Sequence, residues 1–356
     1  MKIAVILGEV TGRGGMETVI TNVINAYNAS GNGIMKLFLL GGSEDETWLK
    51  AINTSDYYIF NSVKEPKANR YLKSVTKAPI ILKEFDPDII LGADEKSVLY
   101  SKIIRPFLNK KTKVGSWIHF SLTSIKPIYK RIIKSADFHL AISDGLQKEF
   151  CDFGIAKKDN VYLTYNPINI TNDLVKRPIS TPHFIYVGRL IYDGQKRVND
   201  LLVALSKTNG NWKLSVIGDG KDKERLIEMA KDLGINDRIL WLGWQTEPWS
   251  CIEDASVLLL TSEYEGLGMV LLEAMSRGIP CISSDCPVGP SNVIKPNENG
   301  WLFPVGETET LSEILNQIIL DQKVLPHQDV VKESVEKFDI NSFINNLNDV
   351  FKKVVS

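Results

Sequence analysis

The feature that most constrains the fold of this chain is an apolar segment followed by two glycines and a helical pattern. The apolar segment, Val257–Thr261, is short and begins and ends with β-branched residues, which favours a buried strand. Gly266 and Gly268 then interrupt the chain, and residues 269–277 predict a helix. Strand, glycine-bearing turn and helix in this order are typical of an open α/β sheet, where ligands bind beside the carboxyl ends of the strands.

The turn between this strand and this helix is a candidate anion site. Its backbone N–H groups lack partners within the helix and lie at the positive end of the helix dipole. These groups belong to Gly266, Leu267, Gly268, Met269 and Val270. Glu265 stays in the turn while Glu273 lies about one helical turn further on, so the two carboxylates can contact different ends of an elongated ligand. Two glutamates near a helix start also complement its dipole, and the pattern alone leaves both interpretations open.

A second glycine-rich turn lies near the N-terminus. Residues 2–7 predict a buried parallel strand, and a helix is expected from about 16 to 27. Gly8, Gly12, Gly14 and Gly15 lie between them, which allows a phosphate to approach the backbone closely. The turn lacks the Walker A lysine and the full dinucleotide fingerprint, and it is also compatible with an ordinary tight turn.

Strand-like and helix-like segments alternate along the whole chain, which predicts parallel sheets wrapped by helices. With 356 residues the chain exceeds the usual size of one core, so we predict two domains, 1–168 and 180–337, with a proline-containing linker between them. Further strands are expected at 35–40, 57–60, 89–91, 113–118, 138–142, 161–164, 183–187, 214–217, 238–242, 280–284 and 300–303. Helices are expected near 66–83, 95–108, 122–135, 144–153, 221–233, 310–320 and 338–354.

Composition excludes several classes of protein. The net charge of −1 gives no sign of nucleic-acid binding, although residues 1–168 carry +6 and the remainder −7. The four cysteines have no zinc-type spacing, so we expect reduced thiols in a cytosolic protein and no metal site. The apolar segment 3–7 is too short for a signal peptide or a membrane span.

Several other residues are candidates for binding. Arg189 and Lys196 follow the first strand of the second domain, where a diphosphate could lie between a planar guanidinium and a mobile ammonium group. His119 follows a strand that ends near Ile118. A basic tract with interleaved aromatic residues could lie on an anionic membrane, or it could be a solvated helix face. It contains Lys102, Arg105, Lys110, Lys111, Lys113, Lys126, Lys130, Arg131 and Lys134. We interpret Asp86-Pro87-Asp88, which precedes a strand, as a turn and not as a metal clamp.

The Glu-x7-Glu pattern, beside Glu-Gly-Leu-Gly and downstream of Val187-Gly188-Arg189-Leu190 and Lys196, resembles glycosyltransferase family 4. The resemblance extends from Gly14-Gly15-Met16-Glu17 to about Gly306. It implies the GT-B fold, with two Rossmann-like, doubly wound parallel-sheet domains facing a cleft. The first domain, with a C-terminal helix (338–356) crossing back to it, would bind the acceptor, and the second would bind a nucleotide sugar.

The resemblance also implies roles for the candidate residues. Glu265 would hold the donor sugar and stabilise its cationic carbon, Arg189 and Lys196 would stabilise the leaving diphosphate, and His119 would contact the donor sugar. Glu273 would accept hydrogen bonds from the ribose, and the base would pack near Trp244, which could equally be a core residue. Further donor contacts would come from Gly14, Gly15, Glu17, Gly188, Gly218, Gln245 and the turn Gly266–Val270.

Several longer segments, such as Gly194–Val198 and Leu242–Gln245, are most similar to galactosyltransferases of the lipopolysaccharide core. This resemblance implies a retaining, metal-independent hexosyltransferase without a cofactor, cytoplasmic or peripheral at the inner membrane face. Its partners would be UDP-galactose and a glycan or glycolipid acceptor, such as the lipopolysaccharide core or a lipid-linked polysaccharide intermediate. UDP-glucose or UDP-N-acetylhexosamine as donor, a UDP-sugar 2-epimerase, an NAD-dependent dehydrogenase and a catalytically silent sugar-binding subunit are the alternatives.

Overall fold

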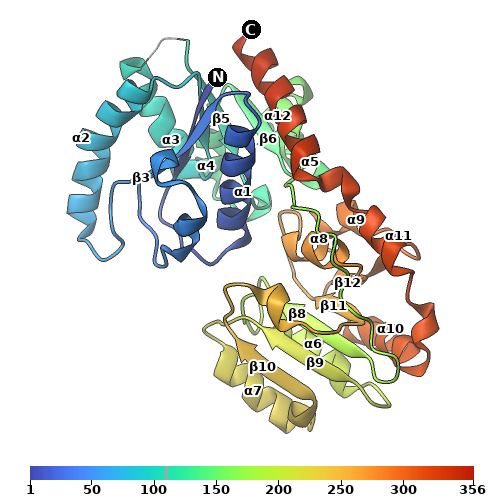
Figure 1. The fold of residues 1–356 in the computed structure, drawn as a ribbon. Helices are drawn as coiled ribbons and strands as arrows, with labels where there is room; N and C mark the ends of the chain where they lie inside the picture. The colour runs from blue at the N-terminus through green and yellow to red at the C-terminus, as the bar shows by residue number, and fades with distance from the viewer. Residues whose placement is uncertain (109–110) are drawn as a thin grey trace. The chain divides into compact units, whose positions relative to one another are not determined.

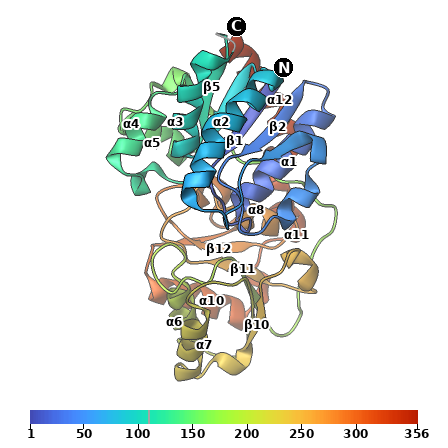
Figure 2. The same cartoon turned by 90° about the vertical axis from the view of Figure 1, so that its left-hand side faces the viewer.

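The computed structural model describes residues 1–108 and 111–356, which form two compact units. The first unit consists of Met1–Asn169 together with Phe338–Ser356, and the second consists of Ile170–Lys337. The chain therefore leaves the first unit once and returns to it for its last helix. Both chain ends lie near each other in the first unit (Figures 1 and 2).

The described residues of the first unit contain a parallel sheet with strand order β3-β2-β1-β4-β5-β6-β7. Its two central strands are buried except at Lys2, as expected for a sheet that helices cover on both faces. The strands are β1 (Lys2–Leu7), β2 (Ile34–Leu39), β3 (Tyr57–Ile59), β4 (Ile89–Gly92), β5 (Lys113–Trp117), β6 (Phe138–Ala141) and β7 (Val161–Leu163).

Helices surround this sheet, and the last helix of the chain packs against the first. The rings of Tyr27 and Phe351 meet there edge to face, with their centroids 6.2 Å apart. The α-helices are α1 (Gly15–Ala29), α2 (Lys67–Phe85), α3 (Glu95–Ile104), α4 (Pro127–Ile133), α5 (Asp144–Asp152) and α12 (Ile340–Val355). Short 3₁₀ helices are η1 (Thr47–Ala51), η2 (Thr54–Asp56), η3 (Arg105–Phe107), η4 (Leu122–Ser124) and η5 (Lys158–Asn160).

The second unit is built on a parallel sheet with strand order β10-β9-β8-β11-β12-β13, in which β11 and β12 lie side by side (Figure 2). Its core joins side chains of these strands to those of α6, α7 and α10. The strands are β8 (His183–Val187), β9 (Lys213–Ile217), β10 (Ile239–Gly243), β11 (Val257–Leu260), β12 (Cys281–Ser284) and β13 (Gly300–Phe303). The helices are α6 (Val198–Ser206), α7 (Lys223–Asp232), α8 (Met269–Met275), α9 (Pro290–Val293), α10 (Thr308–Leu320), α11 (Gln328–Glu333), η6 (Asn236–Arg238), η7 (Pro248–Cys251), η8 (Gln322–Val324) and η9 (Glu336–Phe338).

Both sheets reverse their strand order at one point, between β1 and β4 in the first unit and between β8 and β11 in the second. This is the doubly wound order, and it confirms the predicted fold class of each unit. Loops leave the two central strands in opposite directions at such a switch point, so a crevice for a ligand opens beside their carboxyl ends. The residues that follow β8 and β11 therefore lie where a ligand is expected in the second unit.

Two observed helices differ from the predicted ones at prolines. The helix expected at 122–135 is divided into η4 and α4, and Pro127, which has no N–H to donate, occupies the first turn of α4. The helix expected at 95–108 ends at Ile104, and Pro106 lies in the 3₁₀ turn that follows. Within the described residues, no helix is both long enough and apolar enough to cross a membrane.

Candidate active site

Arg189 lies two residues beyond the end of β8, at the switch point of the second unit. The buried phenol of Tyr186 donates to its backbone carbonyl at 2.9 Å, which fixes the backbone of this turn. Its exposed guanidinium donates from Nη2 to Gln195 Oε1 at 3.1 Å. Arg189 therefore reaches the residue next to Lys196, and the two predicted cations belong to one local cluster.

Lys196 and Glu265 form a largely buried ion pair. Lys196 Nζ donates to Glu265 Oε1 at 2.7 Å, and Ser262 Oγ donates to the same oxygen at 2.6 Å. The lysine and glutamate side chains are 14% and 11% exposed. Thr261 Oγ1 donates to the carbonyls of Lys196 and Arg197 at 3.0 and 2.9 Å, so the end of β11 holds the loop that carries the lysine. The structure thus brings together two residues that are 69 positions apart.

The glycine turn after Glu265 has the predicted form. Gly268 precedes α8 with φ +83°, and its carbonyl accepts from Leu271 N at 2.9 Å. The buried loop around Gly289 packs against Leu267, since a Cβ on that glycine would lie 2.9 Å from the Leu267 Cα. The half-buried residues Met269 and Val270 open the helix. The first amides of the helix, which have no partner within it, therefore follow directly on the Lys196–Glu265 pair.

Glu273 lies within α8 and contacts Trp249, which precedes β11 in the sequence. Trp249 Nε1 donates to Glu273 Oε2 at 3.0 Å, and the guanidinium of Arg277 lies over the indole ring at 4.7 Å. Burial raises the pKa of Glu273 above its ordinary value, and the charge of Glu247 adds to this, while the Trp249 hydrogen bond and the Arg277 charge act in the opposite direction. One carboxylate oxygen is thus held in place by an indole donor.

Close backbone packing explains two of the predicted glycines. A Cβ on Gly218 would lie 1.9 Å from the carbonyl oxygen of Gly188, and φ at Gly218 is +141°. Gly218 N also donates to the Gly243 carbonyl at 2.8 Å, which joins the ends of β9 and β10. These contacts let the loops after three neighbouring strands lie against each other at the carboxyl edge. Nothing in them tests whether Gly188 or Gly218 contacts a donor.

Trp244 and Gln245 follow β10. Trp244 is 41% exposed, so it is not a core residue, which was one of its two interpretations. Gln245 is half-buried, and its Nε2 donates to the Leu242 carbonyl at 2.9 Å. Both positions lie at the carboxyl edge of the sheet, as expected, and their contact with a base stays a prediction.

In the first unit the N-terminal glycine turn is closed by its own glutamate. Glu17 is 4% exposed, and its Oε1 accepts from Gly12 N at 2.9 Å. Gly14 lies against the other oxygen, since a Cβ there would be 2.6 Å from Glu17 Oε2, and Gly15 begins α1. Glu17 therefore holds the turn in shape through a buried hydrogen bond, while Gly14 and Gly15, which were predicted to contact the donor, form the start of α1.

His119 follows β5 at the carboxyl edge of the first sheet. Its Nδ1 accepts from Asn166 Nδ2 at 3.2 Å, so the neutral ring carries its proton on Nε2. Nε2 is buried and has no partner among the described residues. Burial lowers the pKa of His119 to about 3, so the ring is uncharged at neutral pH. It is suited to hydrogen bonding with a hydroxyl group and not to an ionic contact.

The structure also describes the acidic pair that precedes β4 and the four cysteines. Asp88 Oδ2 accepts from Lys2 N at 2.8 Å and Asp86 has a left-handed backbone with φ 49°, so this acidic pair forms a turn. No three His, Cys, Asp or Glu side chains of the described residues gather in a way that could hold a metal ion. All four cysteines lie in the described part of the chain and are free thiols.

Three residues that hold the site had no role in the sequence interpretation. Gln195, Ser262 and Trp249 orient Arg189, Glu265 and Glu273 respectively. Gln195 is adjacent to Lys196 and Ser262 is three positions before Glu265, so proximity in sequence was a usable signal. Trp249 is 24 positions from Glu273, and only the fold shows that they meet.

Two doubly wound sheets in one chain, one of which carries an Arg–Lys–Glu cluster and a glycine turn at its switch point, define a GT-B glycosyltransferase. The chain belongs to this family: residues 13–172 match "Glycosyltransferase Family 4" and residues 174–338 match "Glycosyl transferases group 1". It is 40% identical over 364 aligned residues to the lipopolysaccharide 1,6-galactosyltransferase of Salmonella typhimurium, with 99% of each chain covered.

Solved structures are similar over the same length. The apo form of the lipopolysaccharide outer core galactosyltransferase WaaB matches with a TM-score of 0.84 and 39% identity, covering 99% of this chain and 100% of the other. The Anabaena protein Alr3699/HepE, solved in complex with UDP-glucose, matches with a TM-score of 0.81 at 18% identity, with 99% and 100% covered. The second likeness is one of fold.

Proposed function

We propose that this glycosyltransferase transfers galactose from UDP-galactose to the lipopolysaccharide core with retention of the anomeric configuration. The observation that carries the proposal is the cluster of Arg189, Lys196 and Glu265 at the switch point of the second unit. Whole-length similarity to a lipopolysaccharide 1,6-galactosyltransferase supports the choice of galactose and of this acceptor.

The donor would lie along the carboxyl edge of the second sheet. Glu273, oriented by Trp249, accepts hydrogen bonds from the ribose hydroxyls, and Trp244 offers an exposed ring beside the base. Arg189, Lys196 and the amides at the start of α8 contact the diphosphate, where Arg189 supplies a fork and Lys196 a point charge. The binding of UDP-glucose by the structurally similar Anabaena protein supports a nucleotide-sugar donor.

In the transfer step the bond between the sugar C1 and the UDP oxygen breaks, and an acceptor hydroxyl oxygen forms a bond to C1 on the same face. The acceptor proton passes to the leaving phosphate oxygen, so UDP is the second product. Lys196 and Arg189 stabilise the charge that builds on the diphosphate. Glu265 holds sugar hydroxyls and stabilises the positive charge at C1, and the neutral His119 ring of the first unit is suited to bind a sugar hydroxyl. We assign no covalent nucleophile.

We further propose that transfer requires no metal ion and no cofactor, because two cations can neutralise a diphosphate. Lys196 is already fixed by Glu265 and its loop by Thr261, so its charge is in place before the donor arrives. Activity that persists in EDTA is the expected result. Restoration of a lost activity by manganese would contradict this part of the proposal.

A membrane contact of the first unit belongs to the same proposal. The helices α3 and α4 pack against each other, and exposed apolar side chains lie on α3, η3 and α4 at Ile103, Phe107 and Ile128. Of the predicted basic tract, Lys102 and Arg105 are paired with Asp137, while Lys110 lies outside the described residues. The exposed cations on α4 and its flanks are Lys126, Arg131 and Lys134. Apolar and basic groups on adjacent helices fit an anionic lipid surface.

The experiment that tests the function is a screen of nucleotide sugars against a lipopolysaccharide core that lacks its terminal 1,6-linked hexose. We expect transfer from UDP-galactose, with a new α-linkage seen by NMR and UDP as the co-product. Preference for UDP-glucose or UDP-N-acetylglucosamine would overturn the donor assignment. Conversion of the UDP-sugar into an isomer without any acceptor would indicate an epimerase instead.

A further inference from the structure

A polar cluster at the carboxyl edge of the first sheet has no role in the donor chemistry. Glu9, Gly41 and Asn61 each lie two residues beyond the end of a strand, β1, β2 and β3 respectively. The ends of these three strands are paired in register, so the three residues follow neighbouring strands in step. They lie directly beside the switch point at β1, on the edge where parallel sheets bind ligands.

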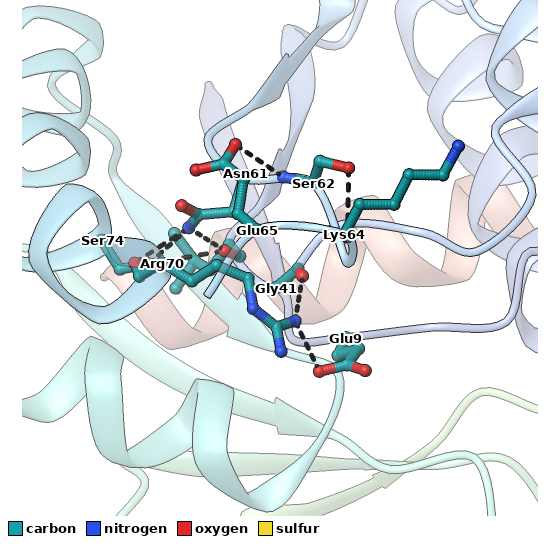
Figure 3. A network of polar contacts seen from close by, with 9 residues as sticks. Glu9, Gly41, Asn61, Ser62, Lys64, Glu65, Arg70 and Ser74 are labelled. Atoms are coloured by element: carbon teal, nitrogen blue, oxygen red, sulfur yellow. Dashed lines mark hydrogen bonds and ion pairs between the residues drawn. The ribbon is translucent and has the colours of Figure 1, made fainter. Parts of the chain in front are cut away.

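Arg70, in the first turn of α2, joins these residues (Figure 3). Its Nη1 donates to Glu9 Oε2 at 2.8 Å and to the Gly41 carbonyl at 3.2 Å. Asn61 Nδ2 holds the same turn of the helix, since it donates to the Arg70 carbonyl at 3.0 Å and to Ser74 Oγ at 2.9 Å. Figure 3 shows the guanidinium pointing toward Glu9. Glu9 is thus held by a side chain that is itself fixed.

The burial of the two partners is unequal. The Arg70 side chain is 13% exposed, whereas the Glu9 side chain is 54% exposed. An ion pair of which one partner is buried gains little net stability, because the desolvation of the cation offsets the attraction. Arg70 Nε and Asn61 Oδ1 are also buried without a partner among the described residues. Buried polar atoms of this kind lower stability, and they are expected where a site serves a function.

Gly41 has a part in presenting Glu9. A Cβ at Gly41 would lie 2.2 Å from the backbone nitrogen of Glu9, so only glycine lets the two backbones pass this closely. The Glu9 backbone is therefore fixed against β2, and its carboxylate is fixed by Arg70. Its second oxygen, Oε1, has no partner among the described residues, and it belongs to a side chain that is more than half exposed.

We propose that Glu9, held by Arg70, binds hydroxyl groups of a neutral sugar residue of the acceptor. A carboxylate with one oxygen fixed and one free accepts hydrogen bonds from a hydroxyl with little loss of side-chain entropy. The exposed carboxylate would repel a nearby phosphate group, and the pair as a whole has no net charge to attract one, so a neutral sugar is the better ligand. This inference rests on the proposed function and adds to it the residues and the acceptor group of the first unit.

The test measures acceptor binding without any donor, by calorimetry with the core oligosaccharide that lacks the transferred hexose. Glu9→Gln removes the charge and is expected to raise Kd about tenfold or more, as loss of a charged hydrogen bond does. Arg70→Lys, which cannot hold Glu9 and the Gly41 carbonyl as the guanidinium does, should also raise Kd. The matched control is Glu65→Gln. Glu65 pairs with Lys73 of the same helix, so this ion pair, like that of Glu9 with Arg70, ties one loop to α2.

The outcomes distinguish a sugar-binding role of Glu9 from a structural one. A Kd raised by Glu9→Gln and unchanged by Glu65→Gln, with the same difference for an acceptor stripped of its phosphates, supports the assignment. If Glu9→Gln and Glu65→Gln change the acceptor Kd equally, or not at all, the Glu9–Arg70 pair only stabilises the position of α2. A difference that disappears on removal of phosphate would assign the cluster to an anion instead. Absence of transfer from UDP-galactose would contradict the proposed function but leave this binding result intact.

Discussion

At the scale of single residues, Lys196 should carry much of the charge stabilisation in the transfer step. Lys196→Ala is expected to lower kcat about 10²-fold or more, because it removes one preorganised donor from the leaving diphosphate. Steady-state kinetics with saturating donor would measure this. The matched control is Lys207→Ala, a lysine of the same unit that pairs with Glu309 on the surface. An unchanged rate for Lys196→Ala would remove this residue from the mechanism.

Trp249→Phe should weaken donor binding in a pH-dependent way. The indole hydrogen bond lowers the pKa of Glu273 against the effect of burial, so its loss raises that pKa further. A protonated Glu273 cannot accept from both ribose hydroxyls, hence donor affinity in the variant is lost at a higher pH than in the native enzyme. The donor KM, measured from about pH 5 to 8, should rise about tenfold at the acid end, with kcat little changed.

The control for this variant is Trp241→Phe, since the Trp241 indole donates to Asn236 in the same unit, away from α8. If the donor KM rises at the same pH in the native enzyme and in Trp249→Phe, the indole only fills space beside Glu273.

The residues of the site were predictable to different degrees. The positions of Arg189, Lys196 and Glu265 at the carboxyl edge follow from strands that can be recognised by their apolar patterns. The direct ion pair of Lys196 with Glu265 does not follow, because it depends on how the loops after β8 and β11 close over each other. Trp249 and Arg70 could not be predicted for the same reason, since each meets its carboxylate only through the tertiary fold.

At the scale of elements, the contact between the ends of β8 and β9 should be sensitive to a single methyl group. Gly218→Ala places a Cβ against the Gly188 carbonyl and forces a residue with φ +141° to carry a side chain. We therefore expect the free energy of unfolding to fall by about 2 kcal/mol or more. Thermal unfolding would measure it. Gly234→Ala is the control, because Gly234 also has a positive φ (+69°) but no described atom lies within 4 Å of its Cβ position. Equal melting temperatures for the two variants would exclude the clash.

Every expected strand is present, with its ends within one residue of the prediction, because buried parallel strands have continuous apolar patterns. The helix α6 was not predicted. It begins after Arg197, a residue with left-handed backbone (φ 44°) whose guanidinium Nε donates to Asp200 Oδ2 at 2.6 Å, so the usual capping signals are missing. The prolines of α4 and η3 had the opposite effect on the prediction: two helices were predicted too long, because the helical pattern continues in sequence past the proline that ends or divides the helix.

At the scale of the whole molecule, the return of the chain to the first unit could not be deduced from periodicity. The amphipathic pattern of α12 predicts a helix, but nothing in the pattern says which unit it joins. Only the family resemblance implied it, and the structure confirms it through the packing of α12 on α1. The charge division is retained in this arrangement, because residues 338–356 carry as many acidic as basic groups and leave the first unit at +6.

This positive unit should bind anionic vesicles through α3, η3 and α4. Phe107→Asp and Lys126→Glu are each expected to lower binding to phosphatidylglycerol vesicles, because the first removes an exposed apolar anchor and the second reverses a charge that contributes about 1 kcal/mol at an anionic surface. Sedimentation with vesicles measures it, and added salt should weaken the native interaction. The control is Ile179→Asp, since Ile179 is 98% exposed but lies in the second, acidic unit. Equal binding of the native protein to phosphatidylcholine vesicles, or equal loss in the control, would show that this surface does not recognise anionic lipid.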